Sequence, residues 1–385
     1  MDFELTEEQE DIRRAAREFA EKEFTPELAL KCDRREEFPW NLYRKMAKLG
    51  FTGLRFDEEW GGQGYGHLEM LLASEEFCRV DSTLGHALSA GTLGSDFILM
   101  YGSEEQKERY LPKVVKGEWL AAGGITEPAH GCDILTLDTT AERNGDNWLV
   151  NGTKTFITHS SISDYAVVVC QTNPELKHRG QTLFIVEKGA EGFEGTELKG
   201  KMGIRATPVG ELSLNEVEVS KDALVGEENK GFYHTLGALD VGRVMAAGRT
   251  IGMAQGAYER ALRYSKERQQ FGQPISQFQA IQHKLAEMAT QIEAARLVTY
   301  QAVFYIDKGT LHYRTLSKLC SMAKLLAADT AVEAASDALQ IYGGYGYYQD
   351  NYVERCYRDV RITQIYEGTN EIQKNGIFGS ISRGY

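Results

Sequence analysis

The chain has 385 residues, a formal net charge of −13 and 42% hydrophobic residues. This length exceeds one typical core, so we expect two or three structural units that share buried faces. The negative charge disfavours binding to nucleic acid, because the summed field repels polyanions. No apolar run approaches the roughly 18 to 20 residues of a transmembrane helix, which predicts no membrane insertion.

The six cysteines are scattered, without a C-x-x-C pair or any metal-ligand spacing. This pattern is typical of free thiols in a reducing compartment and predicts neither disulfides nor a metal site. The opening residues Met1 to Glu4 are acidic, unlike those of signal or transit peptides. We therefore expect a cytoplasmic protein, or one of the mitochondrial matrix if a transit peptide has been removed.

Residues 1–121 predict an N-terminal helical domain. Thr6 and Gln9 have the spacing of a capping box, and Ser103–Gln106 repeats it. The segment Gly61–Gly66 lacks the third glycine of a dinucleotide-binding fingerprint and is predicted to be a flexible loop. Hydrophobic periodicity indicates further helices over residues 42–49, 69–80 and 88–101.

Residues 122–230 predict a middle β-domain. The dipeptides Asn144-Gly145 and Asn151-Gly152 indicate two tight turns of a β-meander. Strands are expected over residues 139–142, 147–150, 153–158, 166–170, 182–186 and 211–219. Because tight glycine turns punctuate this segment, we interpret it as a small barrel or sandwich.

Residues 231–385 predict a C-terminal helical bundle. Nine residues spaced three and four apart form a bundle seam: Phe278, Ile281, Leu285, Met288, Ile292, Ala295, Thr299, Ala302 and Ile306. A further helix over residues 311–341 should end at Gly343-Gly344, as glycine commonly ends helices. The predicted fold class is therefore α+β, in the order helical domain, β-domain, helical bundle.

Glu367 is the candidate catalytic base. It follows Ile365-Tyr366 and precedes Gly368, so its carboxylate stands after an apolar pair, where the backbone can turn sharply. A carboxylate in a partly dry site is a stronger base than one in water, because desolvation raises its pKa. The alternative is a solvated surface glutamate beside a loop glycine, and these residues alone do not separate the two.

The motifs Arg358-Asp359, Arg361-Ile362 and Gln364–Gln373 resemble the C-terminal signature of the acyl-CoA dehydrogenases. The resemblance implies an FAD enzyme that removes a proton from Cα and a hydride from Cβ of an acyl-CoA thioester. By this match Glu367 takes the proton, while Tyr366 and Gly368 contact the substrate. The resemblance also implies that the electrons pass to an electron-transfer flavoprotein.

Two further motifs resemble the family's flavin-binding segments. Residues 123–133, here called the flavin loop, imply that Gly124, Ile125 and Thr126 bind the flavin pyrimidine edge, although a plain turn at Glu127-Pro128 is the alternative. In this loop Cys132 replaces a serine that touches the CoA arm. The second motif implies cofactor contacts from Phe156, Ile157 and Thr158, with Phe156 in place of the usual tryptophan.

A third group resembles the signature for the pyrophosphate and adenosine half of FAD, which a neighbouring subunit of the family tetramer supplies. Arginine suits this role because its planar guanidinium pairs bidentately with phosphate. The match implies a homotetramer. The cofactor residues implied here and near the base are Arg268, Phe271, Phe278, Gln279, Gln340, Gly343, Gly344, Thr369 and Glu371.

The resemblance places Asp240-Val241-Gly242-Arg243 against the CoA chain, with Asp240 and Arg243 as substrate contacts. An arginine near a helix start is more often structural. Gly242 is informative because the isovaleryl-CoA dehydrogenases carry their base at the matching position and glycine in place of the base at 367.

Three other functions stay open at this level: an enoyl-CoA reductase running the reverse reaction, an acyl-CoA oxidase, and a flavin-free helical interaction protein. The substrate is expected to have a short, branched or alicyclic acyl group. A dicarboxylic acyl group is disfavoured, because Thr83-Leu84-Gly85 stands where glutaryl-CoA members usually hold the distal carboxylate with an arginine.

Overall fold

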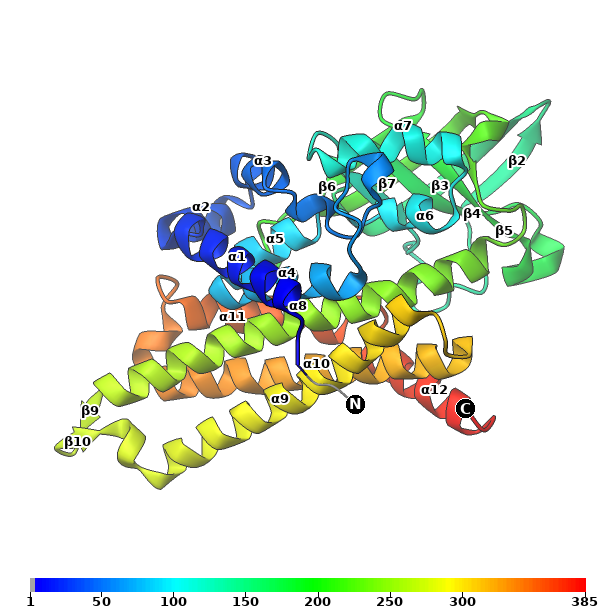
Figure 1. Cartoon of the computed structure of the whole chain (residues 1–385). Helices are drawn as coiled ribbons and strands as arrows, with labels where there is room; N and C mark the ends of the chain where they lie inside the picture. The colour runs from blue at the N-terminus through cyan, green and yellow to red at the C-terminus, as the bar shows by residue number, and fades with distance from the viewer. Residues whose placement is uncertain (1–3) are drawn as a thin grey trace.

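The computed structural model describes residues 4–385, and these fold in the predicted order of helices, β-sheet and helices (Figure 1). The first part holds seven α-helices: α1 (Glu7–Glu23), α2 (Pro26–Arg35), α3 (Trp40–Lys48), α4 (His67–Val80), α5 (Ser82–Ser89), α6 (Ser95–Tyr101) and α7 (Glu104–Val115). Both predicted capping boxes are confirmed, at the starts of α1 and α7.

Two expectations for this part are wrong. The sequence predicts one first helix that continues to a break at Phe38-Pro39-Trp40, whereas α1 ends at Glu23 and α2 starts at Pro26, with the Thr25 side chain as its cap. The helix predicted over residues 88–101 is split into α5 and α6. Gly94 has φ +88° and lies so close to strand residue Ala122 that an added Cβ would stand 2.7 Å from its carbonyl carbon. The chain turns there to pack against the sheet, which a helix could not do.

The middle part is an eight-stranded sheet with the order β6-β7-β3-β2-β4-β5-β8, and β1 pairs with β4. Its strands are β1 (Ala121–Gly124), β2 (Thr140–Asn144), β3 (Asn147–Thr158), β4 (Tyr165–Gln171), β5 (Gln181–Glu187), β6 (Phe193–Glu197), β7 (Val209–Val219) and β8 (Leu224–Val225). The turn predicted at Asn144-Gly145 joins β2 to β3. The turn predicted at Asn151-Gly152 is wrong, because β3 continues through a bulge there and stays paired with β7.

The last part is built on long helices: α8 (Gly231–Glu267), α9 (Gln279–Lys308), α10 (Tyr313–Tyr342), α11 (Tyr352–Val360) and α12 (Asn370–Ile381). A small hairpin of β9 (Gln269–Gln270) and β10 (Gln273–Pro274) joins α8 to α9. Six of the nine seam residues are buried in α9, namely Leu285, Met288, Ile292, Ala295, Thr299 and Ala302. Helix α8 runs through the middle of the molecule, between α4 on one side and α9 and α10 on the other (Figure 1).

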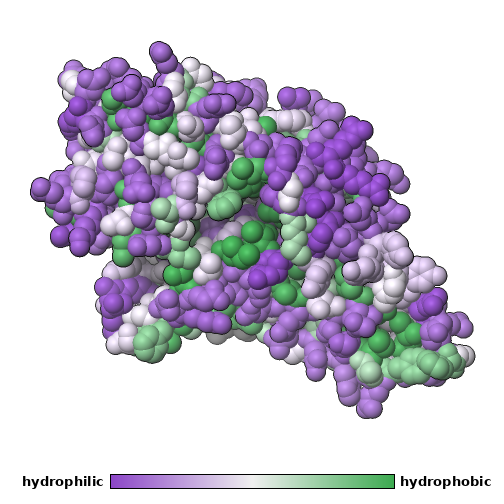
Figure 2. Space-filling model, turned by 180° about the vertical axis from the view of Figure 1, so that it is seen from behind, coloured by the Kyte–Doolittle hydropathy of each residue, from purple (hydrophilic) through white to green (hydrophobic). Residues whose placement is uncertain are grey.

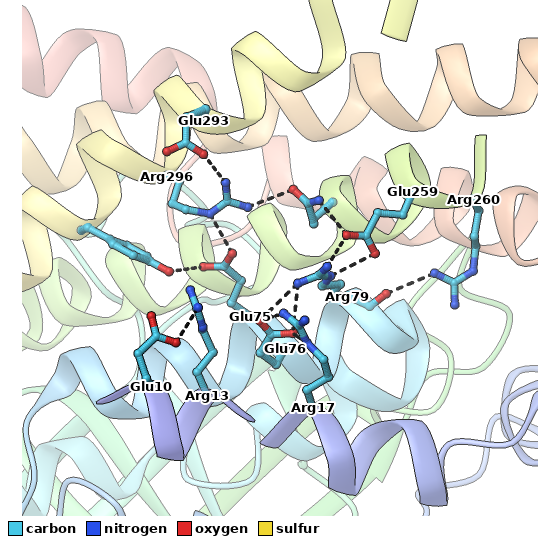
Figure 3. A network of polar contacts seen from close by, with 12 residues as sticks. Glu10, Arg13, Arg17, Glu75, Glu76, Arg79, Glu259, Arg260, Glu293 and Arg296 are labelled. Carbon is cyan, nitrogen blue, oxygen red and sulfur yellow. Dashed lines mark hydrogen bonds and ion pairs between the residues drawn. The ribbon is translucent and has the colours of Figure 1, made fainter. Parts of the chain in front are cut away.

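Charged side chains join four of these helices below the surface (Figure 3). Glu75 of α4 accepts hydrogen bonds from Arg296 Nε and from the Tyr300 hydroxyl of α9, both at 2.9 Å. Glu76 accepts from Arg17 of α1, with Nη2 to Oε1 at 2.6 Å. The network fixes how α1, α4, α8 and α9 pack, because each carboxylate meets a planar donor.

Within residues 4–385, every helix is too short or too polar to cross a membrane.

Candidate active site

Glu367 lies in a loop of residues 365–369, here called the base loop, between a 3-10 turn (Arg361–Gln364) and α12. Glu367 has φ +55° and Gly368 has φ +85°, so two successive residues are left-handed. For a residue other than glycine this conformation costs on the order of 1 to 3 kcal/mol and persists only where the surroundings impose it. Gln373 of α12 does so, donating from Nε2 to the Glu367 carbonyl at 2.9 Å.

The Glu367 carboxylate lies directly over Gly242 of α8. A Cβ added to Gly242 would stand 2.8 Å from Glu367 Oε2, so the absence of a side chain there makes room for the carboxylate. No described residue donates a hydrogen bond to this carboxylate, and the Glu367 backbone N–H likewise has no acceptor in residues 4–385. Burial raises the pKa of Glu367, while Arg249, Arg243 and Lys324 oppose that rise.

Lys324 of α10 binds the base loop and the start of α12. Its ammonium donates to the Gly368 carbonyl at 2.8 Å and to Asn370 Oδ1 at 3.1 Å. Burial lowers the pKa of Lys324 to about 8, although the neighbouring Glu367 acts against it. The lysine therefore places a positive charge near the Glu367 carboxylate at neutral pH.

Arg243 and Asp240, predicted as substrate contacts, are bound to the protein itself. Arg243 donates from Nη1 to Asp240 Oδ1 at 2.6 Å and reaches the Glu367 carbonyl at 3.4 Å. Asp240 also accepts from the Ser317 hydroxyl at 2.9 Å. Burial raises the pKa of Asp240, against the attraction of Arg243. The Arg243–Asp240 pair supports the base loop from α8, in agreement with the alternative that Arg243 has a structural role.

Tyr366 turns into the protein rather than outward. Its hydroxyl is buried without a hydrogen-bond partner among the described residues, and its ring stacks on His86 with centroids 6.0 Å apart. His86 Nδ1 shares a hydrogen bond with the Thr207 hydroxyl at 3.0 Å. Burial lowers the pKa of His86 well below its ordinary value, so this ring is neutral.

The first two residues of the C-terminal signature tie domains together. Asp359 accepts from the hydroxyls of Ser82 and Thr83 at 2.7 and 2.6 Å. Arg358 pairs with Asp33 at 2.9 Å. Both residues anchor α11 against the N-terminal helices, and the base loop follows from that anchored helix.

The two predicted flavin segments lie side by side. Thr155 N donates to the Thr126 carbonyl at 2.9 Å, which joins the segment Gly124–Thr126 to Phe156–Thr158. The flavin loop reaches the base loop where Cys132 Sγ stands 3.8 Å from Thr369 Oγ1. Thr369 in turn caps α12, beside Glu371. Figure 2 shows that the face opposite to that of Figure 1 is hollowed in its middle, with apolar residues lining the hollow.

The Thr-Glu-Pro part of the flavin loop is held by Glu127. This buried carboxylate accepts from Lys154 Nζ at 2.7 Å and from the backbone N–H groups of Asp138 and Thr139. Glu127 also closes a turn with His130 through paired backbone hydrogen bonds. A turn is therefore present at Glu127-Pro128, and it is fastened to strand β3, which leaves open whether the segment also binds a flavin.

The residues of this region fit a flat aromatic cofactor. Phe156 is 69% exposed although it is a large apolar side chain, and its φ is +57° at an irregularity in the pairing of β3 with β7. A strained, exposed phenylalanine gains nothing from the protein itself, so a ligand that covers it accounts for both features.

The third predicted group lies far from the base. Arg268 directly follows α8, 26 residues beyond Gly242, or roughly 39 Å at 1.5 Å per residue. Arg268, Gly343 and Gly344 line a pocket of about 470 Å³ there. Gln340 is exposed nearby, Phe271 is 93% exposed and packs edge-on to Phe278, and Gln279 opens α9. One chain therefore does not bring this group to the Glu367 site.

Three residues of the site lacked a sequence signal. Lys324 acts on a backbone carbonyl, and His86 and Arg249 belong to helices whose local patterns are those of ordinary core helices. Gln373 ends the C-terminal signature, but its hydrogen bond to the Glu367 carbonyl was not predicted. The one available hint for Arg249 was its position seven residues after Gly242, which places both on one face of α8.

Comparison with known proteins covers nearly the whole chain. Family models match in order: acyl-CoA dehydrogenase N-terminal domain (residues 6–118), middle domain (residues 122–217) and C-terminal domain (residues 229–381). The short-chain specific acyl-CoA dehydrogenase of Clostridium acetobutylicum is 41% identical, over 100% of both chains. The caffeyl-CoA reductase-Etf complex subunit CarC of Acetobacterium woodii is 40% identical, over 98% of this chain and 99% of its own.

Among solved structures, butyryl-CoA dehydrogenase from Megasphaera elsdenii superposes with a TM-score of 0.94. It is 38% identical and is covered over 100% of both chains. Likeness of this extent includes the base loop, the flavin loop and the α8–α9 hairpin.

Proposed function

The chain belongs to the acyl-CoA dehydrogenase family, whose members are FAD-dependent oxidoreductases acting on CH–CH bonds, and we propose that it dehydrogenates a short acyl-CoA thioester to the 2-enoyl-CoA. The proposal rests on one observation above all. The Glu367 carboxylate is crowded over Gly242, and burial raises its pKa, yet no described residue hydrogen-bonds to it. A carboxylate left in this state is suited to accept a proton from a ligand.

In this proposal Glu367 removes the proton from Cα of the thioester. A thioester α-proton is too weakly acidic for a free carboxylate, so the enzyme must stabilise the developing enolate. The Glu367 backbone N–H, which has no acceptor in the described chain, is placed to donate to the thioester carbonyl. Lys324, Arg243 and Gln373 hold the strained loop so that base and donor keep one geometry.

We assign the hydride acceptor to FAD, which takes the hydride from Cβ at its N5 position when bound. Gly124, Ile125 and Thr126 would face its pyrimidine edge, and Phe156, Ile157 and Thr158 would cover the ring system. Support for this assignment comes from the hydrogen bond that joins the two segments and from the exposure of Phe156.

We propose that a second copy of the chain holds the adenosine half of FAD, within the homotetramer that the family resemblance implies. Support comes from the distance that separates Arg268 from Gly242 along α8 and from the exposed Phe271 beside it. Arg268→Ala should release FAD and weaken the tetramer together, because ligand and assembly would share one site. Unchanged flavin content and unchanged oligomeric state in this variant, measured by absorbance and light scattering, would contradict the assignment.

The direction of the reaction is a separate question, because relatives of similar identity carry the names of a dehydrogenase and of a reductase-Etf complex subunit. We propose the dehydrogenation direction with an electron-transfer flavoprotein as acceptor. Stopped-flow mixing of oxidised enzyme with butyryl-CoA should bleach the flavin. Reoxidation should need the electron-transfer flavoprotein.

Two outcomes would redirect this proposal. A flavin that stays oxidised with butyryl-CoA, while chemically reduced enzyme is reoxidised by crotonyl-CoA, would assign the chain to reductases. Stoichiometric hydrogen peroxide in air without a carrier protein would assign it to oxidases.

A further inference from the structure

Four arginines of the described chain are buried, and three of them pair with an acid. Arg55 pairs with Asp96, Arg355 with Asp81 and Arg243 with Asp240. Arg249 is 3% exposed, and its side chain makes no ion pair or hydrogen bond with any residue from 4 to 385. Its Nε is buried without a partner. A buried guanidinium carries five hydrogen-bond donors and a full charge. Burying it without a partner is therefore costly unless a ligand pairs with it.

Arg249 lies next to the reaction site on α8. It follows Gly242 by two helical turns, on the same face, roughly 10 Å further along the axis. Side chains on a helix lean toward its N-terminus, which carries the guanidinium back toward Gly242 and the Glu367 carboxylate above it. The charge of Arg249 is the first of those that oppose the raised pKa of Glu367, in agreement with this placement.

The groups around Arg249 offer it no counter-ion. His86 and Cys78 are kept neutral by burial, which lowers the pKa of the first and raises that of the second. Tyr366 is neutral for the same reason. Glu367 is a carboxylate whose raised pKa Arg249 opposes, and in the proposed function it is the base that must stay free. The protein around Arg249 is therefore polar and positively charged, unlike the wall expected around an alkyl chain.

We propose that Arg249 is a specificity-determining residue and that the preferred substrate is the CoA thioester of a short dicarboxylic acid, whose distal carboxylate pairs with this guanidinium. The inference rests on the proposed function and names its substrate class. A planar guanidinium matches a carboxylate bidentately. A dicarboxylic substrate was disfavoured because α5 has no arginine at Thr83–Gly85. Arg249 of α8 can bind the distal carboxylate instead, so that reason no longer applies.

The test compares acids of equal chain length on the full-length, FAD-loaded enzyme. Glutaryl-CoA and adipyl-CoA are set against valeryl-CoA and hexanoyl-CoA, with anaerobic flavin bleaching as the readout. The diacid thioesters should have the larger kcat/KM by at least about 10²-fold, because a site built to bind a polar group rejects analogues that lack it. Faster reaction with valeryl-CoA than with glutaryl-CoA would overturn the proposal.

Two variants assign the preference to the residue. Arg249→Gln should remove the advantage of glutaryl-CoA, mainly through KM, while Arg249→Lys keeps part of it because the charge remains. Each is accepted only with wild-type flavin content. If Arg249→Gln loses its flavin, calorimetric binding of glutaryl-CoA and valeryl-CoA to Arg249→Lys and to wild type decides instead. An unchanged preference in a flavin-loaded variant would contradict the role of Arg249. Failure of all four thioesters to bleach wild-type flavin would instead count against the proposed function.

Discussion

Two carboxylates in this protein have pKa values shifted in the same direction but have different surroundings. Burial raises the pKa of Glu75 and of Glu367 alike. Glu75 accepts from Arg296 and Tyr300 within the network of Figure 3, whereas no described residue donates to the Glu367 carboxylate. The same contrast separates Arg296, which pairs with two acids, from Arg249, which pairs with none among residues 4–385.

The difference teaches that the direction of a pKa shift does not by itself mark a catalytic group. Hydrogen bonding inside the protein distinguishes the two carboxylates. Buried charges with complete partners fix the packing of helices, and charges without partners are retained where a ligand is to supply them. The two glutamates also differ in backbone strain. Glu367 has a left-handed backbone conformation, whereas Glu75 lies within a regular helix.

The largest expected effect is that of Glu367→Gln, which keeps size and hydrogen-bonding capacity but removes the proposed base. Flavin reduction by substrate should slow by about 10² to 10⁴-fold, with flavin content and acyl-CoA binding retained. Glu333→Gln on the exposed side of α10 is the matched control and should react at the wild-type rate.

Removal of a partner from the paired region should act on stability instead. Arg296→Ala leaves Glu75 buried with one donor, and the free energy of unfolding should fall by about 3 to 5 kcal/mol. Arg14→Ala breaks an exposed pair with Asp11 and should change the free energy of unfolding by less than about 0.5 kcal/mol. Denaturant unfolding of the FAD-loaded proteins measures both. Equal effects of the two variants would remove the distinction between paired burial and surface pairing.

Transfer of the base tests the geometry over Gly242. A side chain there would meet the Glu367 carboxylate, so Gly242→Glu is best combined with Glu367→Gly. The double variant should reduce its flavin at least about tenfold faster than Glu367→Gly alone, since a carboxylate returns to the same space. Equal rates in the two variants would show that the space between α8 and the base loop is not the reaction site.

The smallest effect is a pH dependence of stability. Because the folded-state pKa of Glu367 is raised, the native protein holds a proton that the unfolded chain has already lost. Stability from this group is present below about pH 4.5 and is lost as pH rises through the folded pKa. The Tm of Glu367→Gln should therefore gain on that of wild type across this window and then stay level. A difference independent of pH would place the carboxylate in solvent.

Local sequence predicted the elements whose determinants are local. The Thr6–Gln9 capping box and the α9 seam are confirmed because side chains within one or two turns decide them. The turn predicted at Asn151-Gly152 is wrong because long-range pairing with β7 extends β3 through that dipeptide, and Gly152 is needed instead for close approach to Thr139. Tertiary contact overrode a turn signal.

The site divides in the same way. Glu367 and the flavin segments stand in recognisable motifs, so the sequence predicts them, and the structure brings the base loop, flavin loop and Gly242 together. Arg249 has no such motif. The proposed role of Arg249 depends on its lack of a hydrogen-bond or ion-pair partner. That lack is a property of the folded chain, and residue spacing in the sequence does not predict it.

The central claim, that Glu367 exchanges a proton with Cα, is tested most directly by following the α-protons of a saturated acyl-CoA substrate by NMR in D₂O without an electron acceptor. Wild-type enzyme should replace these protons with deuterium, and Glu367→Gln should do so about 10² to 10⁴-fold more slowly at equal flavin content. Exchange by Glu367→Gln at the wild-type rate would contradict the claim and assign the proton transfer to another group.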